Sequence, residues 1–341
     1  MKSLVLFNNK GGVGQTTLTF NIAHMVSRLG LRTVVLDYDP QCSISAIFLG
    51  EQALFDLWES PEGEGLTVAR SIDPVRRGEG DVLPPKLVGV GDNLWLLPGD
   101  LALSRFEQTL AEEWPKTRSV DNARALDVTT ALDFLSNLAA DAVQADLLLL
   151  DVGPSLGALN RAALLACDAV VLPLAPDPFS LQGLKNVGPT LREWRRDWTV
   201  VRNAHLHGRE QEGLPPHGFK PLGYIVQQHL ARADRPVAGY ERWFAQIPFV
   251  FHQHVLGEQE ASPSLRVEQD EACIATLRHF ASLAPLAELA RKPMFDLKRA
   301  DGIGGGQIQA VAKCRAEFEG LAATLSQLLA LPASLGSSAA R

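Results

Sequence analysis

Lys10-Gly11-Gly12-Val13-Gly14-Gln15-Thr16-Thr17 is the stretch that decides the fold. It follows an apolar run at residues 4–7, which predicts a buried strand, and it opens residues 16–29, whose apolar side chains have helical spacing. Glycines in such a turn let backbone N–H groups surround phosphate oxygens, and the helix N-terminus adds partial positive charge. A threonine in the first helical turn can place its hydroxyl on Mg²⁺. The stretch therefore predicts a phosphate-binding loop between a strand and a helix.

The flanking sequence predicts the rest of the fold. Residues 33–36 are a second apolar run that ends at Asp37, so the first forty residues predict a strand–helix–strand unit. Uninterrupted apolar strands imply a parallel sheet that is covered on both faces. We predict an α/β fold with a doubly wound, mostly parallel sheet and helices on both faces. The other predicted strands are residues 94–97, 147–150, 169–172 and 222–226, and the main helices are 126–140, 156–166 and 181–194.

Later segments are less regular. A short extended piece is predicted at Ile247-Pro248, and residues 271–289 and 309–331 are predicted to be helical. We predict one main domain over residues 1–290, with insertions at about 60–90 and 205–217 that are rich in Gly, Pro and polar residues. A C-terminal helical extension over 291–331 and a flexible tail over 332–341 complete the predicted organisation.

Composition excludes several classes of protein. The 46% hydrophobic and 21% charged residues among 341 are typical of a globular chain, not of a disordered or fibrous one. The net charge of −7 argues against a uniformly basic nucleic-acid binder, although a local basic patch stays open. No apolar run approaches the roughly 18 residues of a membrane-spanning helix. We therefore expect no membrane partner. The four cysteines are far apart, so we also expect no disulfide framework and a cytoplasmic location.

Several motifs together resemble the ParA/MinD family of deviant Walker A ATPases. Residues 10–17 resemble that family's phosphate loop, KGGxGKT, and residues 37–41 (DYDPQ) resemble its first switch motif. Residues 148–157 (LLLDVGPSLG) resemble its Walker B strand and second switch, and residues 97–100 (LPGD) and 166–173 match further segments in the same order. The resemblance covers about residues 1–290 and implies a P-loop NTPase fold that binds ATP or ADP with Mg²⁺.

The resemblance also implies a role for each matching residue. Lys10 is the signature lysine that reaches the nucleotide of a partner subunit across a homodimer formed with ATP. Asp39 would position the attacking water, so the catalytic positions are Lys10, Asp39 and Gln15. Magnesium would be held by Thr16, Asp37, Asp39 and Asp151, directly or through water. The nucleotide-binding residues implied are Gly11, Gly12, Val13, Gly14, Gln15, Thr16 and Thr17, with Pro248 near the base.

Gln15 departs from the family pattern, which has a lysine at this position. A lysine reaches the β- and γ-phosphates as a point charge, whereas glutamine keeps a donor and loses the positive charge. We therefore expect impaired hydrolysis in this chain, because that charge offsets the charge that develops during phosphoryl transfer. Two explanations stay open: an introduced Lys→Gln change, or a natural loss of activity. Intact Lys10, Thr16, Asp39 and Asp151 favour the first.

Partners follow from the same resemblance. ParA-like proteins bind DNA without sequence preference through basic residues, and the candidates here are Arg232 and Arg235, with nucleoid association as a consequence. Phe249-Val250-Phe251-His252 stands where DNA-binding members commonly carry arginines, which weakens that expectation. A ParB-like or adaptor protein would activate the ATPase.

The sequence thus predicts a ParA-like, ATP-dependent dimerising ATPase that acts as a switch for partitioning or positioning DNA or a protein cargo. The alternative is a nucleotide-sensing scaffold or regulator that does not hydrolyse its nucleotide, for example in a defence system. An iron–sulfur reductase of the related nitrogenase-iron-protein type is disfavoured, because Cys42 and Cys167 lack the expected surroundings.

Overall fold

A single central β-sheet organises the molecule. The computed structural model describes residues 1–61, 66–206, 214–215, 218–228, 237–259, 265–278, 280 and 282–332. Within these residues eight strands form one sheet in the order β3-β4-β2-β5-β1-β6-β7-β8. Neighbouring strands are parallel except β3 and β4. The strands are β1 (Lys2–Leu6), β2 (Thr33–Asp37), β3 (Val88–Gly91), β4 (Leu94–Leu97), β5 (Leu147–Asp151), β6 (Ala169–Leu174), β7 (Lys220–Gln228) and β8 (Cys273–Arg278).

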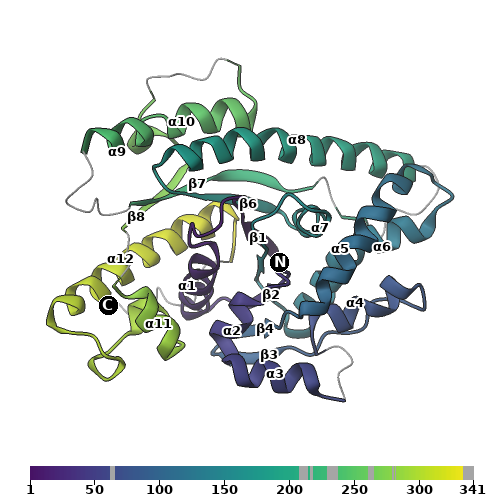
Figure 1. Cartoon of the computed structure of the whole chain (residues 1–341), viewed down its shortest axis with the longest axis horizontal. Coiled ribbons are helices and arrows are strands. Elements are labelled where there is room, and N and C mark those ends of the chain that lie inside the picture. Colours follow the sequence, from purple (N-terminus) through teal and green to yellow (C-terminus); the bar gives the residue numbers. More distant parts are fainter. Residues whose placement is uncertain are drawn as a thin grey trace.

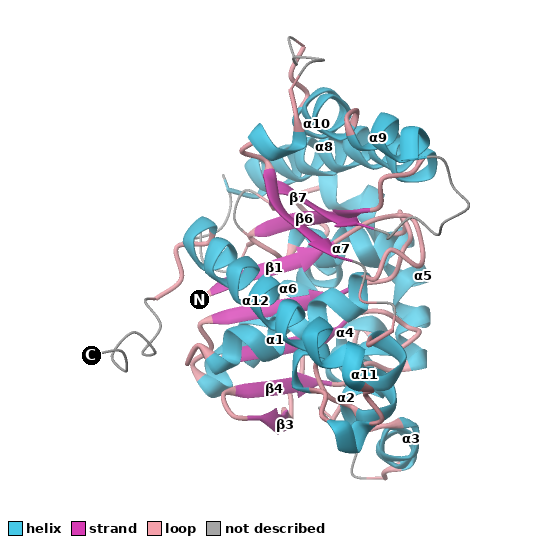
Figure 2. Cartoon of the chain, turned by 90° about the vertical axis from the view of Figure 1, so that its left-hand side faces the viewer, coloured by secondary structure: helices cyan, strands magenta, loops and turns pink. Residues whose placement is uncertain are grey.

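Alternate residues of the central strands supply two hydrophobic cores, one on each face of the sheet. Leu4 and Leu6 join one core, and Val5 and Phe7 join the other. Helices α1 (Gln15–Arg28), α11 (Ala284–Ala290) and α12 (Gly305–Leu328) cover the first face. The opposite face is covered by α5 (Ser104–Glu113), α6 (Ala123–Val143), α7 (Ala158–Leu165) and α8 (Pro178–Leu206) (Figures 1 and 2). The predicted doubly wound α/β fold class is confirmed.

Strand order determines where a ligand can bind. Strand β1 lies between β5 and β6, and the chain leaves this centre toward both edges of the sheet. In open α/β sheets, the crevice outside the carboxyl ends of the strands at such a switch point is the usual ligand site. The loop at residues 10–17 follows β1 directly and therefore occupies that crevice.

Two predictions of secondary structure are wrong, and the segment predicted as an insertion at 60–90 contains two elements that were not predicted. Ile247 and Pro248 begin helix α10 (Ile247–Val250), where a proline in the first turn costs no hydrogen bond. Residues 271–289 contain strand β8 before α11, because Cys273–Arg278 pairs in parallel with β7 at the edge of the sheet. The predicted insertion at 60–90 includes helix α4 (Val68–Arg77) and strand β3, and α4 buries Val68, Ile72 and Val75 along one stripe.

The predicted insertion at 205–217 and the tail at 332–341 fall mostly outside the described residues. Helix α12 confirms the predicted late helix, and it begins four residues earlier than the predicted segment at 309–331. Its Phe318, Leu321 and Leu325 are at most 2% exposed and belong to the same hydrophobic core as α1. The boundary at residue 290 stays a prediction. The remaining helices are α2 (Ser43–Leu49), α3 (Glu51–Glu59), α9 (Val237–Phe244) and the π-helical turn Phe251–Leu256.

Candidate functional site

The loop after β1 has the backbone of an anion cradle. Gly12 and Gly14 have φ angles of +75° and +72°, which side chains rarely adopt. Gly14 immediately precedes helix α1, and no side chain caps that helix N-terminus. The first N–H groups of a helix without a side-chain cap need another acceptor, and an anion can supply it. The backbone therefore fits a phosphate group at this loop.

Three carboxylates lie beside the loop, and we call Asp37, Asp39 and Asp151 the acidic edge. Asp37 and Asp151 are register partners at the ends of β2 and β5, and both are fully buried. Asp39 is 6% exposed and lies next to Gly153, where a Cβ would be 3.1 Å from its Oδ1. The predicted metal-site carboxylates therefore do converge at one edge of the sheet.

Hydrogen bonds satisfy the acidic edge only in part. Asp37 Oδ2 accepts from the Ser45 hydroxyl at 2.5 Å and from the Ser45 N–H at 3.1 Å. Asp151 Oδ2 accepts from the Thr16 hydroxyl at 3.0 Å, which joins the acidic edge to the phosphate loop. Asp151 Oδ1 is buried without a hydrogen-bond partner, although buried polar atoms are normally paired. An unpartnered carboxylate oxygen beside a threonine hydroxyl suits a cation.

Burial raises the pKa of all three carboxyls. The pKa of Asp37 rises to about 7 because burial disfavours its charged form, and Ser45 opposes the shift only in part. Burial also raises the pKa of Asp39 and, together with the neighbouring Asp37 charge, raises that of Asp151 well above its usual range. A divalent cation would reverse these shifts by favouring the charged forms.

The acidic edge does not form a metal cage by itself. No group of three His, Cys, Asp or Glu side chains among the described residues has the arrangement to hold a metal ion. Magnesium usually keeps several waters and takes one or two carboxylates together with substrate phosphates. Thr16 and Asp151 fit that pattern best because they already touch each other. Mg²⁺ would therefore need a phosphate ligand to complete its coordination.

Gln15 is built into the fold. Its side chain is 9% exposed, its Nε2 donates to the Val152 carbonyl at 2.5 Å, and its Oε1 accepts from the Asn8 N–H at 3.2 Å. These contacts tie the first turn of α1 to the chain just after β1 and just after β5. Both polar ends of the amide are thus satisfied within the chain, and the position carries no positive charge.

Lys10 has a partner within its own chain. Its Nζ lies 2.5 Å from Asp177 Oδ2, next to the start of helix α8, and 6.0 Å from the ring centroid of Phe179. Burial alone would raise the pKa of Asp177, but hydrogen bonds from Lys10 and Ser180 and the Lys10 charge lower it below its usual value. Phe179 is 73% exposed, so this ion pair lies at a surface that another molecule can reach.

A small pocket of about 110 Å³ adjoins the other side of the loop. Gly12, Gly14 and Thr17 line it together with Gln227 from the end of β7 and Arg278 from the end of β8. Sequence reasoning missed both Gln227 and Arg278. The strand prediction for 222–226 could have pointed to Gln227, which follows it directly. Arg278 could not be placed at the end of a strand, because the segment that contains it was predicted to be helical.

The other sequence-predicted residues have different outcomes. Gly11 and Val13 lie in the loop as expected, and the Val13 carbonyl accepts a hydrogen bond from Gln227. Pro248 does not line the pocket beside the loop; it is buried in α10, which packs against α8. Arg232 and Arg235, the predicted DNA contacts, lie outside the described residues.

Gly99 links the acidic edge to a region farther from the loop. The Gly99 N–H donates to the Ser45 hydroxyl oxygen at 2.9 Å, and the Gly99 carbonyl accepts from Trp58 Nε1 at 3.0 Å. A Cβ at this position would lie 2.8 Å from Asp37 Cγ, so only glycine fits without movement of the carboxylate. The predicted match at residues 97–100 thus corresponds to a segment that packs against Asp37.

Comparisons with known proteins agree with this geometry. A family model described as an AAA domain matches residues 1–203. The chain is 31% identical over 208 residues to protein IncC of Escherichia coli, covering 60% of this chain and 48% of that protein. It is 31% identical over 195 residues to the chromosome-partitioning ATPase Soj of Thermus thermophilus, covering 57% and 63%. The chain thus spans between about half and two thirds of these relatives.

Protein DIP2308 of Corynebacterium diphtheriae has the same fold, with a TM-score of 0.70 and 22% identity over 96% of this chain and 99% of that chain. The fold and the loop at its carboxyl edge define a P-loop NTPase. The chain belongs to the ParA/MinD-like family of AAA-domain ATPases. None of the helices among its described residues combines the length and apolar character that crossing a membrane requires.

Proposed function

We propose that this chain is a nucleotide-dependent dimerising switch that partitions or positions a cargo, with ATP hydrolysis impaired by Gln15. The observation that carries the proposal is the meeting of the phosphate loop and the acidic edge through the Thr16–Asp151 hydrogen bond. The relative named as a chromosome-partitioning ATPase supports the same class of function. Its location would be cytoplasmic, or on the nucleoid where DNA is bound.

Each residue of the site has a distinct task in this proposal. The loop backbone from Gly11 to Thr17 binds phosphate oxygens of ATP or ADP, and Thr16 and Asp151 hold Mg²⁺, with Asp37 next to them. The bound cation supplies positive charge that offsets the charge on the phosphates. Asp39, which lies next to Gly153 and is 6% exposed, orients the attacking water. Gln15 fills the place of a charged residue with a neutral amide.

Restoring the missing charge tests the ATPase part of the proposal. Gln15→Lys should raise the rate of Mg²⁺-dependent ATP hydrolysis at least about 10²-fold, which is the scale for a charge that stabilises the transition state. Gln327→Lys at the exposed end of α12 adds the same charge far from the loop and should leave the rate unchanged. Equal rates for Gln15→Lys and the unaltered chain, with nucleotide bound in both, would contradict the proposal.

Lys10 supports the dimer. The loop amides would already surround a nucleotide bound to the same chain, so a lysine before the glycines would be available for the phosphate of a second copy. Lys10 would then exchange Asp177, its partner in the single chain, for that phosphate. Two-fold symmetry would repeat the contact at both nucleotides.

Sedimentation velocity tests the dimer. The double variant Gln15→Lys with Asp39→Ala should dimerise with ATP because its hydrolysis is blocked. Adding Lys10→Ala should return it to monomer with one-site nucleotide binding nearly unchanged, whereas adding Lys86→Ala, an exposed lysine elsewhere, should not. A Lys10→Ala protein that dimerises as well as its parent would rule out the sandwich arrangement.

DNA binding is the least supported part of the proposal, because Arg232 and Arg235 lie outside the described residues. If the protein acts on DNA, its ATP-bound dimer should bind DNA of any sequence at low salt and release it as the salt concentration rises. Replacing both arginines with Glu should weaken binding to all sequences alike. Absence of binding at low salt would instead favour a protein cargo recruited through a ParB-like or adaptor protein.

One observation favours the scaffold alternative. Both polar ends of the Gln15 amide have partners within the chain, so glutamine fits this position without strain. A protein that binds nucleotide without hydrolysing it would use such a residue. The Gln15→Lys measurement separates the two functions, because a scaffold should gain no turnover from the lysine.

A further inference from the structure

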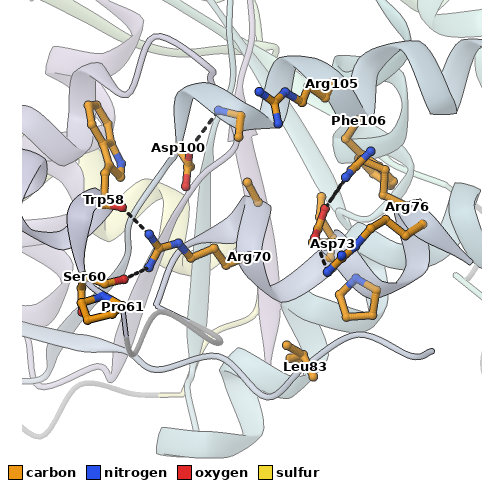
Figure 3. A pocket seen from close by; sticks show the side chains of 15 residues that line it. Trp58, Ser60, Pro61, Arg70, Asp73, Arg76, Leu83, Asp100, Arg105 and Phe106 are labelled. Carbon is orange, nitrogen blue, oxygen red and sulfur yellow. Dashed lines mark hydrogen bonds and ion pairs between the residues drawn. The ribbon is translucent and has the colours of Figure 1, made fainter. Parts of the chain in front are cut away.

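A second and larger pocket lies away from the phosphate loop, among helices α3, α4 and α5. Its volume is about 790 Å³, within the range of small-molecule sites. It shares no lining residue with the pocket beside the loop. Figure 3 shows its side chains converging from these helices and from residues 58–61. We call it the arginine pocket, after its lining residues Arg70, Arg76, Arg77 and Arg105.

The acidic residues of the arginine pocket are already occupied. Asp73 pairs with Arg76 at 2.7 Å and with Arg77 at 2.8 Å, and Arg77 also pairs with Glu79 at 3.2 Å. Asp100 accepts from the Ala102 N–H at 2.8 Å and from the Thr67 hydroxyl at 3.0 Å. Neither carboxylate therefore serves the other two arginines.

Arg70 and Arg105 carry the uncompensated charge. Arg70 donates to the carbonyls of Ser60 and Trp58, which are neutral acceptors (Figure 3). Arg105 is exposed and forms no ion pair with any residue that the structure describes. The four guanidinium groups thus meet two lining carboxylates and Glu79, which leaves a net positive charge where a ligand would sit.

Apolar side chains form the rest of the wall. Trp58, Leu83 and Phe106 line the same hollow as the arginines. Guanidinium forks bind carboxylate and phosphate groups through paired hydrogen bonds, and an apolar wall accommodates an organic body. We propose that the arginine pocket binds a small organic anion, a phosphate monoester or a dicarboxylate, with its acidic group on Arg105 and Arg70.

Calorimetric titration with two matched probes tests the proposal. Phenyl phosphate and phthalate both carry one benzene ring, and they separate the phosphate source from the carboxylate source. At low salt we expect one of them to bind the unaltered chain at millimolar concentration or below. Arg105→Ala should weaken that binding about tenfold or more, because it removes a charged hydrogen-bond donor. Arg299→Ala, an exposed arginine elsewhere, should not change it.

Folding does not confound this test. Arg105 makes no hydrogen bond through its side chain within the described residues, so its removal should leave the melting temperature unchanged. Arg70→Lys serves as a second variant, because it keeps the charge and loses the planar fork, and it should also weaken binding. Absence of heat with either probe at millimolar concentration would overturn the proposal. A different result would also overturn the proposal. If excess ADP abolishes the binding heat and Arg105→Ala does not change it, the anion binds at the phosphate loop.

Discussion

The acidic edge and the arginine pocket each hold an excess of charge of one sign, but they hold it in different ways. The carboxylates of the acidic edge are at most 6% exposed, and burial raises the pKa of each of them. The arginines pair in part with Asp73 and are half-buried or exposed, so they stay charged at little cost. Charging the acidic edge therefore costs free energy that a bound cation would offset, whereas the arginine pocket carries its charge without a ligand.

The two regions are connected through Gly99. Its N–H and carbonyl bond to Ser45 on the side of Asp37 and to Trp58 on the side of the arginine pocket. Arg70 in turn donates to the Trp58 carbonyl. Variants on each side therefore show whether the regions respond to mutation independently.

The largest effect is expected at the acidic edge during hydrolysis. In the Gln15→Lys background, Asp39→Ala should lower the ATP hydrolysis rate at least about 10²-fold, because it removes the group that orients water. Asp92→Ala, an exposed aspartate in the turn between β3 and β4, is the matched control. Steady-state phosphate release measures both. A smaller loss than about tenfold would show that Asp39 does not act on the water.

The next largest effect compares how tightly the hydrophobic side chains are packed next to each of the two regions. Leu150 is fully buried in β5, directly before Asp151, whereas Leu83 at the arginine pocket is half-buried. Leu150→Ala should lower the free energy of unfolding by about 3 kcal/mol, because it leaves a cavity, and Leu83→Ala by about 1 kcal/mol. Urea titration compares them. Equal losses would contradict the difference in packing between the regions.

The pH dependence of stability provides the third comparison. The pKa of Asp37 is about 7 in the folded chain, above its usual value, so the folded state holds a proton that the unfolded state has released. The free energy of unfolding should therefore fall as pH rises from about 4 to 7. The loss should be on the order of 2 kcal/mol, and it should be absent in Asp37→Asn. Thermal or urea unfolding at pH 5 and pH 8 measures it. A gap between Asp37→Asn and the unaltered chain that does not widen with pH would contradict this expectation.

The smallest effects are expected from two arginines of the arginine pocket. Arg70→Ala should lower the free energy of unfolding by about 1 kcal/mol, because two backbone carbonyls lose a charged donor. Arg105→Ala should change it by less than about 0.5 kcal/mol, as for an exposed side chain without contacts. Urea titration of the two variants side by side suffices. If Arg105→Ala lowers the free energy of unfolding more than Arg70→Ala, the hydrogen bonds of Arg70 do not stabilise the fold as this account expects.

The phosphate loop and the acidic edge could be predicted from sequence because their signals are local. Residues 10–17 carry the glycines and the threonine together, and Asp37 and Asp151 each directly end a run of apolar residues. Parallel strands bring their carboxyl ends to one edge, so the meeting of these side chains follows from the fold class. The structure confirms that meeting through the register pair Asp37 and Asp151.

The residues that sequence analysis missed have partners far away in the sequence or lie in segments with a weak hydrophobic pattern. The partner of Lys10 is Asp177, which is 167 positions away in the sequence. Arg278 lies on an edge strand whose buried side chains, Ile274 and Leu277, are three positions apart, a spacing that also suits a helix. The apolar stripe of α4 is interrupted by Pro74 and stands among charged residues, so the helix that carries Arg70, Arg76 and Arg77 was not predicted.

Binding of Mg²⁺-nucleotide to the unaltered chain tests the central claim most directly, namely that the loop and the acidic edge form a nucleotide site despite Gln15. Calorimetric titration with ADP or ATP should give one-site binding at millimolar concentration or below, because the loop backbone and Thr16 are intact. Omitting Mg²⁺ should weaken it, since the carboxylates then repel the phosphates. Absence of heat with both nucleotides at millimolar concentration in the presence of Mg²⁺ would contradict the claim.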